Sequence, residues 1–166
     1  GVSVTVVGPE APVAGMILLL AGAVNALRLA RWRGWLAWRE PLVWILHIAY
    51  GWLAVGLLLL GATVLTSAVP ASAGIHALTA GAIGTMTLAV MTRASRGHTG
   101  RALAADGLTL AIYLAILMAG IARVAAPFGG DFQAGLLVVS AAFWALAFGG
   151  FAAGYGPMLL TPRRRA

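Results

Sequence analysis

The sequence predicts an all-α protein, a bundle of five helices that cross a membrane. Hydrophobic residues make up 61% of the 166 residues and charged residues only 9%, whereas about a quarter of the residues of a soluble domain are charged. Five apolar runs are each long enough to span ~30 Å of hydrocarbon at ~1.5 Å per residue. A chain of this composition cannot cover its own surface with polar groups, so a lipid bilayer must surround it.

The predicted helices are bounded by residues that commonly start and stop helices. Pro41 suits the first turn of the second helix, Pro70 and Ser72 precede the third, and Pro127 with Gly129 ends the fourth. We expect the five spans at residues 12–29, 41–66, 73–92, 104–126 and 134–160. Together they form a single transmembrane domain over residues 1–166. Because the sequence begins at Gly1 without an initiator methionine, we expect it to be a fragment of a longer protein.

The positions of the basic residues predict how the helices are oriented. All eleven basic residues are arginine. Ten of them lie at the end of the first span or between it and the second, between the third and fourth, and after the fifth. Because arginine near the ends of spans stays on the cytoplasmic side, we expect the N-terminus outside and the C-terminus in the cytoplasm. The same clusters indicate contact with membrane lipid headgroups, so no nucleic-acid partner is expected despite the formal charge of +7.

The connection between the first two spans interleaves three tryptophans with three arginines over residues 31–39. This composition is typical of a segment that lies in the headgroup layer, which is the interpretation we favour. The alternative is that these arginines bind the anionic edge of a cofactor.

The three histidines are the candidate metal ligands, because ionisable residues at membrane depth are costly and usually functional. His47 lies in the second expected helix beside Gly51 and Ala54, whose small size leaves room for a flat macrocycle or a closely packed helix. His76 lies in the first turn of the third expected helix, where the helix dipole favours the neutral, metal-binding ring. His98 falls in an expected loop. The alternative is that each histidine only forms hydrogen bonds.

His47 and His76 are not expected to bind the same metal ion. The second helix enters from the cytoplasm and the third from outside, so the two histidines lie ~16 Å apart in depth. The absence of cysteine excludes thiolate ligands, and no nucleotide-binding or hydrolytic motif is present. If both histidines bind metal, they belong to separate sites.

Three stretches of the sequence resemble a known family. They are RWRGWLAWREPLVWILHIAYGWLAVGL at 31–57, HALTAGAIGTMTLAVMTRASRGHTGR at 76–101 and YGPMLLTPR at 155–163. Through them the chain resembles the C-terminal part of NnrS-type membrane proteins. The resemblance implies a bacterial inner-membrane protein that carries haem and copper. It also implies a role in nitric oxide metabolism and in protection from nitrosative stress during denitrification.

Carried onto this chain, the resemblance implies that His47, His76 and His98 are metal ligands, the first two for haem or copper. Arg93 and Arg101 would then pair with haem propionates, or would only flank their helices as topology signals. The resemblance leaves open whether nitric oxide is reduced, bound or sensed, and reduction would need an electron donor. Two other hypotheses are a cofactor-free transporter or channel subunit and a structural anchor for a redox partner.

Overall fold

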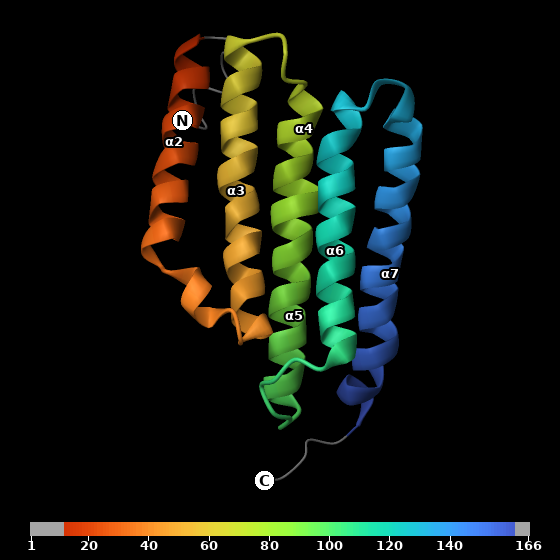
Figure 1. The fold of residues 1–166 in the computed structure, drawn as a ribbon. Helices are drawn as coiled ribbons and strands as arrows, with labels where there is room; N and C mark the ends of the chain where they lie inside the picture. Colours follow the sequence, from red (N-terminus) through yellow and green to blue (C-terminus); the bar gives the residue numbers. More distant parts are fainter. Residues whose placement is uncertain (1–11, 162–166) are drawn as a thin grey trace.

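The computed structural model describes residues 12–161 and consists of long helices that stand side by side (Figure 1). Five helical segments in this range are long and apolar enough to cross a membrane, and the range contains no β-strand. The all-α transmembrane prediction is therefore confirmed. The α-helices are α2 (Pro12–Arg31), α3 (Pro41–Leu65), α4 (Ala71–His76), α5 (Gly84–His98), α6 (Gly107–Ala125) and α7 (Gln133–Leu160).

Four short helical segments complete the described part of the chain. A 3₁₀ turn, η1 (Gly34–Ala37), lies between α2 and α3, and two more, η3 (Ala126–Phe128) and η4 (Gly130–Phe132), connect α6 to α7. The fourth, η2 (Ala77–Ile83), is a π-helix that joins α4 to α5 without a break. The third span is therefore one helix, Ala71–His98, with a widened middle.

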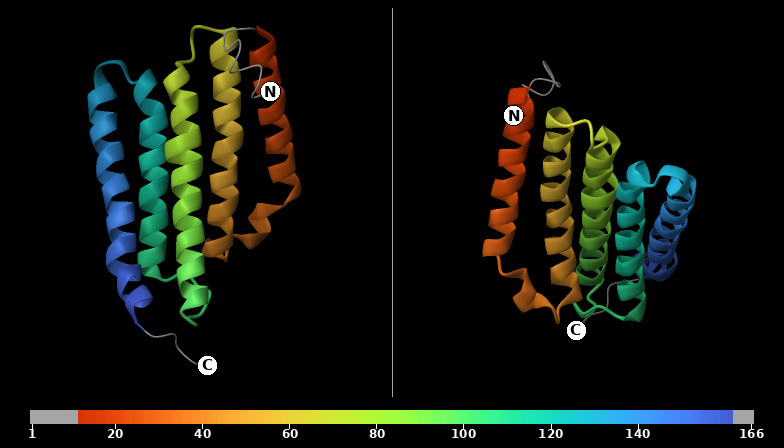
Figure 2. Two further views of the ribbon diagram at one scale, coloured as in Figure 1. Left: turned by 180° about the vertical axis from the view of Figure 1, so that it is seen from behind. Right: turned by 45° about the horizontal axis from the view of Figure 1, so that its top comes forward.

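The helices follow one another in chain order across a single curved layer (Figures 1 and 2). Helix α2 packs on α3, α3 packs on the α4–η2–α5 helix, that helix packs on α6, and α6 packs on α7. The layer leaves α2 and α7 at its two edges. The connections after α2 and after α5 lie at one end of the layer, and those after α3 and α6 lie at the other (Figure 1).

The arginines that precede residue 161 therefore gather at one end, as the topology prediction requires, apart from Arg123 near the end of α6. Arginines 163–165 lie outside the described residues. Which end faces the cytoplasm stays a prediction.

Glycine and one polar pair hold α2 against α3. A Cβ atom at Gly61 would lie 2.8 Å from the carbonyl oxygen of Gly15, so the two backbones are in direct contact. The Tyr50 hydroxyl donates a 2.5 Å hydrogen bond to the side-chain oxygen of Asn25. Lipid tails are as apolar as the side chains of these helices, so there is little hydrophobic driving force for helices to associate in a membrane. Close packing and hydrogen bonds between helices drive association instead.

The third span differs from its expected range of 73–92. It begins at Ala71, directly after Pro70, whose extended backbone (ψ 134°) ends the preceding connection. It continues past residue 92 to His98 because Arg96, on its last turns, finds hydrogen-bond partners on α6 and α7. His76 is consequently the sixth residue of α4 and not in the first turn, so the helix-dipole argument for its neutral ring no longer applies. His98 ends a helix instead of lying in a loop.

The π-helix packs against both α3 and α6. A Cβ atom at Gly81 would lie 2.6 Å from Cδ2 of Trp52 on α3, and one at Gly120 on α6 would lie 3.4 Å from the Gly81 Cα. A side chain at position 81 would collide with the indole of Trp52, whereas a methyl group at position 120 would make ordinary contacts with it. π-Helical turns are rare and are frequently found at functional sites.

Candidate functional site

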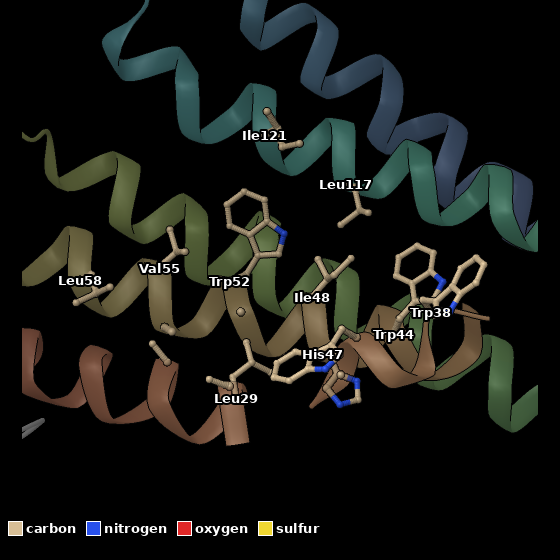
Figure 3. A pocket seen from close by; sticks show the side chains of 16 residues that line it. Leu29, Trp38, Trp44, His47, Ile48, Trp52, Val55, Leu58, Leu117 and Ile121 are labelled. Atoms are coloured by element: carbon tan, nitrogen blue, oxygen red, sulfur yellow. The ribbon is translucent and has the colours of Figure 1, made fainter. Parts of the chain in front are cut away.

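A large pocket lies between α2, η1, α3 and α6 (Figure 3). Its volume is about 980 Å³, at the upper end of the range typical of small-molecule and cofactor sites. We call it the tryptophan pocket. It is lined by Ala26, Leu29, Ala30, Gly34, Trp35, Trp38, Trp44, His47, Ile48, Gly51, Trp52, Ala54, Val55, Leu58, Leu117 and Ile121.

His47 is the one ionisable residue in this lining. Its Nδ1 lies 3.0 Å from the carbonyl oxygen of Val43, one turn earlier in α3. Because a carbonyl oxygen only accepts hydrogen bonds, this contact requires a proton on Nδ1 and leaves the lone pair on Nε2. Histidines that bind metals are commonly held in this way, with the second nitrogen donating to a backbone carbonyl.

The imidazole of His47 is held from two sides by the segment that precedes α3. A Cβ atom at Gly34 would lie 2.5 Å from Cδ2 of the ring, so η1 passes directly against it. The ring of Trp32 meets the imidazole edge-on, with 6.1 Å between ring centroids. The ring is therefore fixed in one orientation before any ligand arrives.

The small residues expected beside His47 do leave open space. Gly51 and Ala54 both line the pocket. Tyr50, which also follows His47, takes no part in the lining and instead bonds to Asn25. On the far wall, Trp52, Leu117 and Ile121 close the space from α3 and α6 (Figure 3).

Arginine lies close to the aromatic side chains at this end of α3. The Arg39 guanidinium carbon lies 5.1 Å from the ring centroid of Trp38, which lines the pocket. Both the interfacial anchor and the anionic-edge interpretation of this segment are compatible with that position. The large exposure of Trp38, 67%, places it where a headgroup or a cofactor edge can reach it.

None of the other predicted site residues lines the tryptophan pocket. His76 is half-buried on α4 and lies near the positive charge of Arg123. His98 and Arg93 are exposed on α5. Arg101 donates a 3.4 Å hydrogen bond from its guanidinium to the Thr161 hydroxyl. Within residues 12–161, no three His, Asp or Glu side chains come together as a metal site would require.

A buried polar network that the sequence reasoning missed joins α5, α6 and α7. Arg96, whose side chain is 9% exposed, forms an ion pair with Asp106. Its Nε donates to the Tyr155 hydroxyl at 3.1 Å, and a terminal nitrogen donates to Thr109 at 3.3 Å. The Thr109 hydroxyl donates to Asp106 at 2.7 Å and lies 2.5 Å from the Tyr155 oxygen. Each of the four side chains thus bonds to at least two others.

Asp106 sits at the N-terminus of α6, outside the membrane-spanning part of that helix. Burial acts to raise the pKa of its carboxyl group, but hydrogen bonds from Thr109 and the nearby charge of Arg96 outweigh it. The pKa of Asp106 therefore lies below its ordinary value. One signal in the sequence pointed here, since Asp106 and Thr109 have the spacing of a helix N-cap, and the Asp106 side chain does accept from the Thr109 backbone N–H.

Comparison with known proteins gives one match. The model of the family described as NnrS protein matches residues 2–163, almost the whole chain. Neither the comparison with curated proteins nor the comparison with solved structures found a match. With its five membrane-spanning helices and this match, the chain is a multi-pass membrane protein that belongs to the NnrS family.

Proposed function

We propose that this protein binds haem in the tryptophan pocket through His47 and handles nitric oxide there, in a bacterial inner membrane. One observation carries the proposal. A half-buried histidine whose Nε2 lone pair is available lines an apolar space of about 980 Å³ between helices. The family name supports the link to nitric oxide.

The residues present fit a haem group. The pocket lining is aliphatic and aromatic apart from His47, as an apolar macrocycle requires. His47 would hold the iron through Nε2, with its ring held by Val43 and Gly34. Haem also carries two carboxylates, and Arg39, which lies over the pocket residue Trp38, could pair with one of them.

When bound, haem would supply an iron that can bind a diatomic molecule such as nitric oxide. The chain's own contribution is to place the imidazole, to exclude water and to admit a small neutral molecule from the lipid phase. The four indoles and the aliphatic side chains of α3 and α6 provide the water-excluding wall. The alternative of a cofactor-free transporter needs a polar path, which this lining does not offer.

Copper, and metal binding by His76 or His98, stay predictions from the family resemblance. His76 lies on α4 and His98 at the end of α5. Within residues 12–161, neither of them belongs to a group of three or more His, Asp or Glu side chains that could hold a metal ion. We therefore derive no step through copper. Arg93 and Arg101 likewise stay predicted propionate partners. Reduction of nitric oxide, and an electron donor for it, also stay predictions.

The experiment is an absorption spectrum of the purified, reduced protein before and after nitric oxide is added. The proposal predicts a Soret band that shifts with nitric oxide in the wild type. The band should be lost in His47→Ala and kept in His98→Ala, which removes an exposed imidazole outside the pocket. A shifting Soret band that survives His47→Ala unchanged would refute the proposal.

A further inference from the structure

A notch on the face of α2 that is turned away from the tryptophan pocket is lined by two arginines and by apolar side chains. It has a volume of about 510 Å³ and is lined by Val24, Leu27, Arg28, Arg31 and Trp32. We call it the arginine notch. These residues recur at helical spacing on one face. The α2 residues that line the tryptophan pocket, Ala26, Leu29 and Ala30, lie on another face, so the notch opens on a different side of α2. Trp32 lies between the two sites, since its ring also meets that of His47.

The two guanidinium groups of the notch have no anionic partner within residues 12–161. Arg28 lies over the ring of Trp32, with 5.2 Å between its guanidinium carbon and the ring centroid. Neither Arg28 nor Arg31 forms an ion pair or a side-chain hydrogen bond with a described residue, since the one ion pair found there joins Arg96 to Asp106. The notch therefore presents two positive charges that nothing in the described chain neutralises.

The depth of the notch matches the headgroup layer. Helix α2 has 20 residues, which at ~1.5 Å per residue spans the ~30 Å hydrocarbon core. Arg28 and Arg31 lie in its last turn and Trp32 follows it, so they reach the level of lipid phosphates. Val24 and Leu27 lie one turn deeper and are 53% and 67% exposed, as expected for side chains that touch acyl chains.

We propose that the arginine notch is a binding site for one anionic phospholipid. The planar guanidinium groups of Arg28 and Arg31 would hold the phosphate by paired N–H···O hydrogen bonds. Trp32 keeps Arg28 in place, and Val24 with Leu27 receives the upper part of an acyl chain. Two cations without a carboxylate beside them favour a headgroup of net negative charge over the zwitterionic choline headgroup.

The test is native mass spectrometry of the purified, delipidated protein with either phosphatidylglycerol or phosphatidylcholine of the same acyl chains. The wild type should retain phosphatidylglycerol in preference. Arg28→Gln and Arg31→Gln should each weaken that retention about fivefold, the change that corresponds to about 1 kcal/mol per basic residue at an anionic surface. Arg123→Gln, which removes a charge from the last turn of α6, should leave it unchanged.

Three results would overturn the proposal. One is equal retention of the two lipids by the wild type. Another is an equal loss in Arg123→Gln, which would mean that net charge alone attracts the lipid. The third is displacement of phosphatidylglycerol by inorganic phosphate at equal concentration, which would identify a simple anion site. Trp32→Leu keeps both charges and tests the geometry, because it should weaken phosphatidylglycerol binding without changing the net charge.

Discussion

The Nε of Arg96 donates a 3.1 Å hydrogen bond to the hydroxyl of Tyr155, a residue 59 positions later in the chain. The bond joins α5 to α7 across the start of α6, where Asp106 balances the guanidinium charge. A buried guanidinium without partners would be strongly unfavourable. The position of these three helices relative to one another therefore depends on this network being complete.

Removing the Tyr155 hydroxyl should destabilise the fold. Tyr155→Phe leaves a nitrogen of the buried Arg96 without its acceptor, and we expect a loss of about 1–3 kcal/mol, seen as a lower midpoint of thermal unfolding in detergent. Tyr50→Phe is the matched control, because it removes one hydroxyl from a neutral pair with Asn25. A loss in Tyr50→Phe as large as that in Tyr155→Phe would contradict the special role of the charged network.

The network should also make stability depend on pH in the acid range. The pKa of Asp106 in the folded protein lies below its ordinary value of 3.8. Its ionised form therefore stabilises the fold at higher pH, and this contribution is lost as the pH falls through the folded-state pKa. The unfolding midpoint of the wild type should drop over that range and that of Asp106→Asn should change less. Asp131→Asn, at the other end of the layer, should behave like the wild type.

The close contact between Gly34 and His47 offers a second way to test whether the pocket binds haem. Gly34→Ala would place a Cβ atom 2.5 Å from Cδ2 of the imidazole, so the ring must turn. If His47 binds haem iron, haem affinity measured by titration should fall about tenfold, as for other changes that disturb the groups orienting a metal ligand. Gly149→Ala on α7 has open space around its new methyl group and should bind haem like the wild type.

The orientation of the layer can be tested directly because the chain has no cysteine. Phe132→Cys and Leu103→Cys place single thiols in exposed connections at opposite ends of the layer. A maleimide that cannot cross membranes should label Phe132→Cys on intact cells and Leu103→Cys only after the cells are opened. The reverse pattern would place the arginine-rich connections outside and would contradict the topology prediction.

The five spans could be predicted from the sequence because each is a long apolar run with few charges, a signal that depends only on local composition. The irregularities of the third span could not. The π-helix packs against Trp52 of α3 and Gly120 of α6, and local composition does not reveal such contacts between helices. The extension to His98 depends on partners that Arg96 finds on α6 and α7.

Part of the candidate site could also be predicted from the local sequence. The space beside His47 follows from Gly51 and Ala54 at helical spacing, and both residues do line the pocket. The tryptophan walls from η1 and the aliphatic side chains of α6 belong to segments whose position no local pattern reveals. Nothing in the local sequence distinguishes Arg96 from Arg93 and Arg101. Only the packed structure shows that Arg96 is the buried arginine of the three.

The central claim is that His47 holds haem in the tryptophan pocket, and the haem content of the purified protein tests it most directly. The haem-to-protein ratio should be stoichiometric in the wild type and in His98→Ala, and should fall to background in His47→Ala, with helix content by circular dichroism unchanged in all three. A wild type that is purified from haem-replete cells without haem, and that takes up none on titration, would contradict the claim.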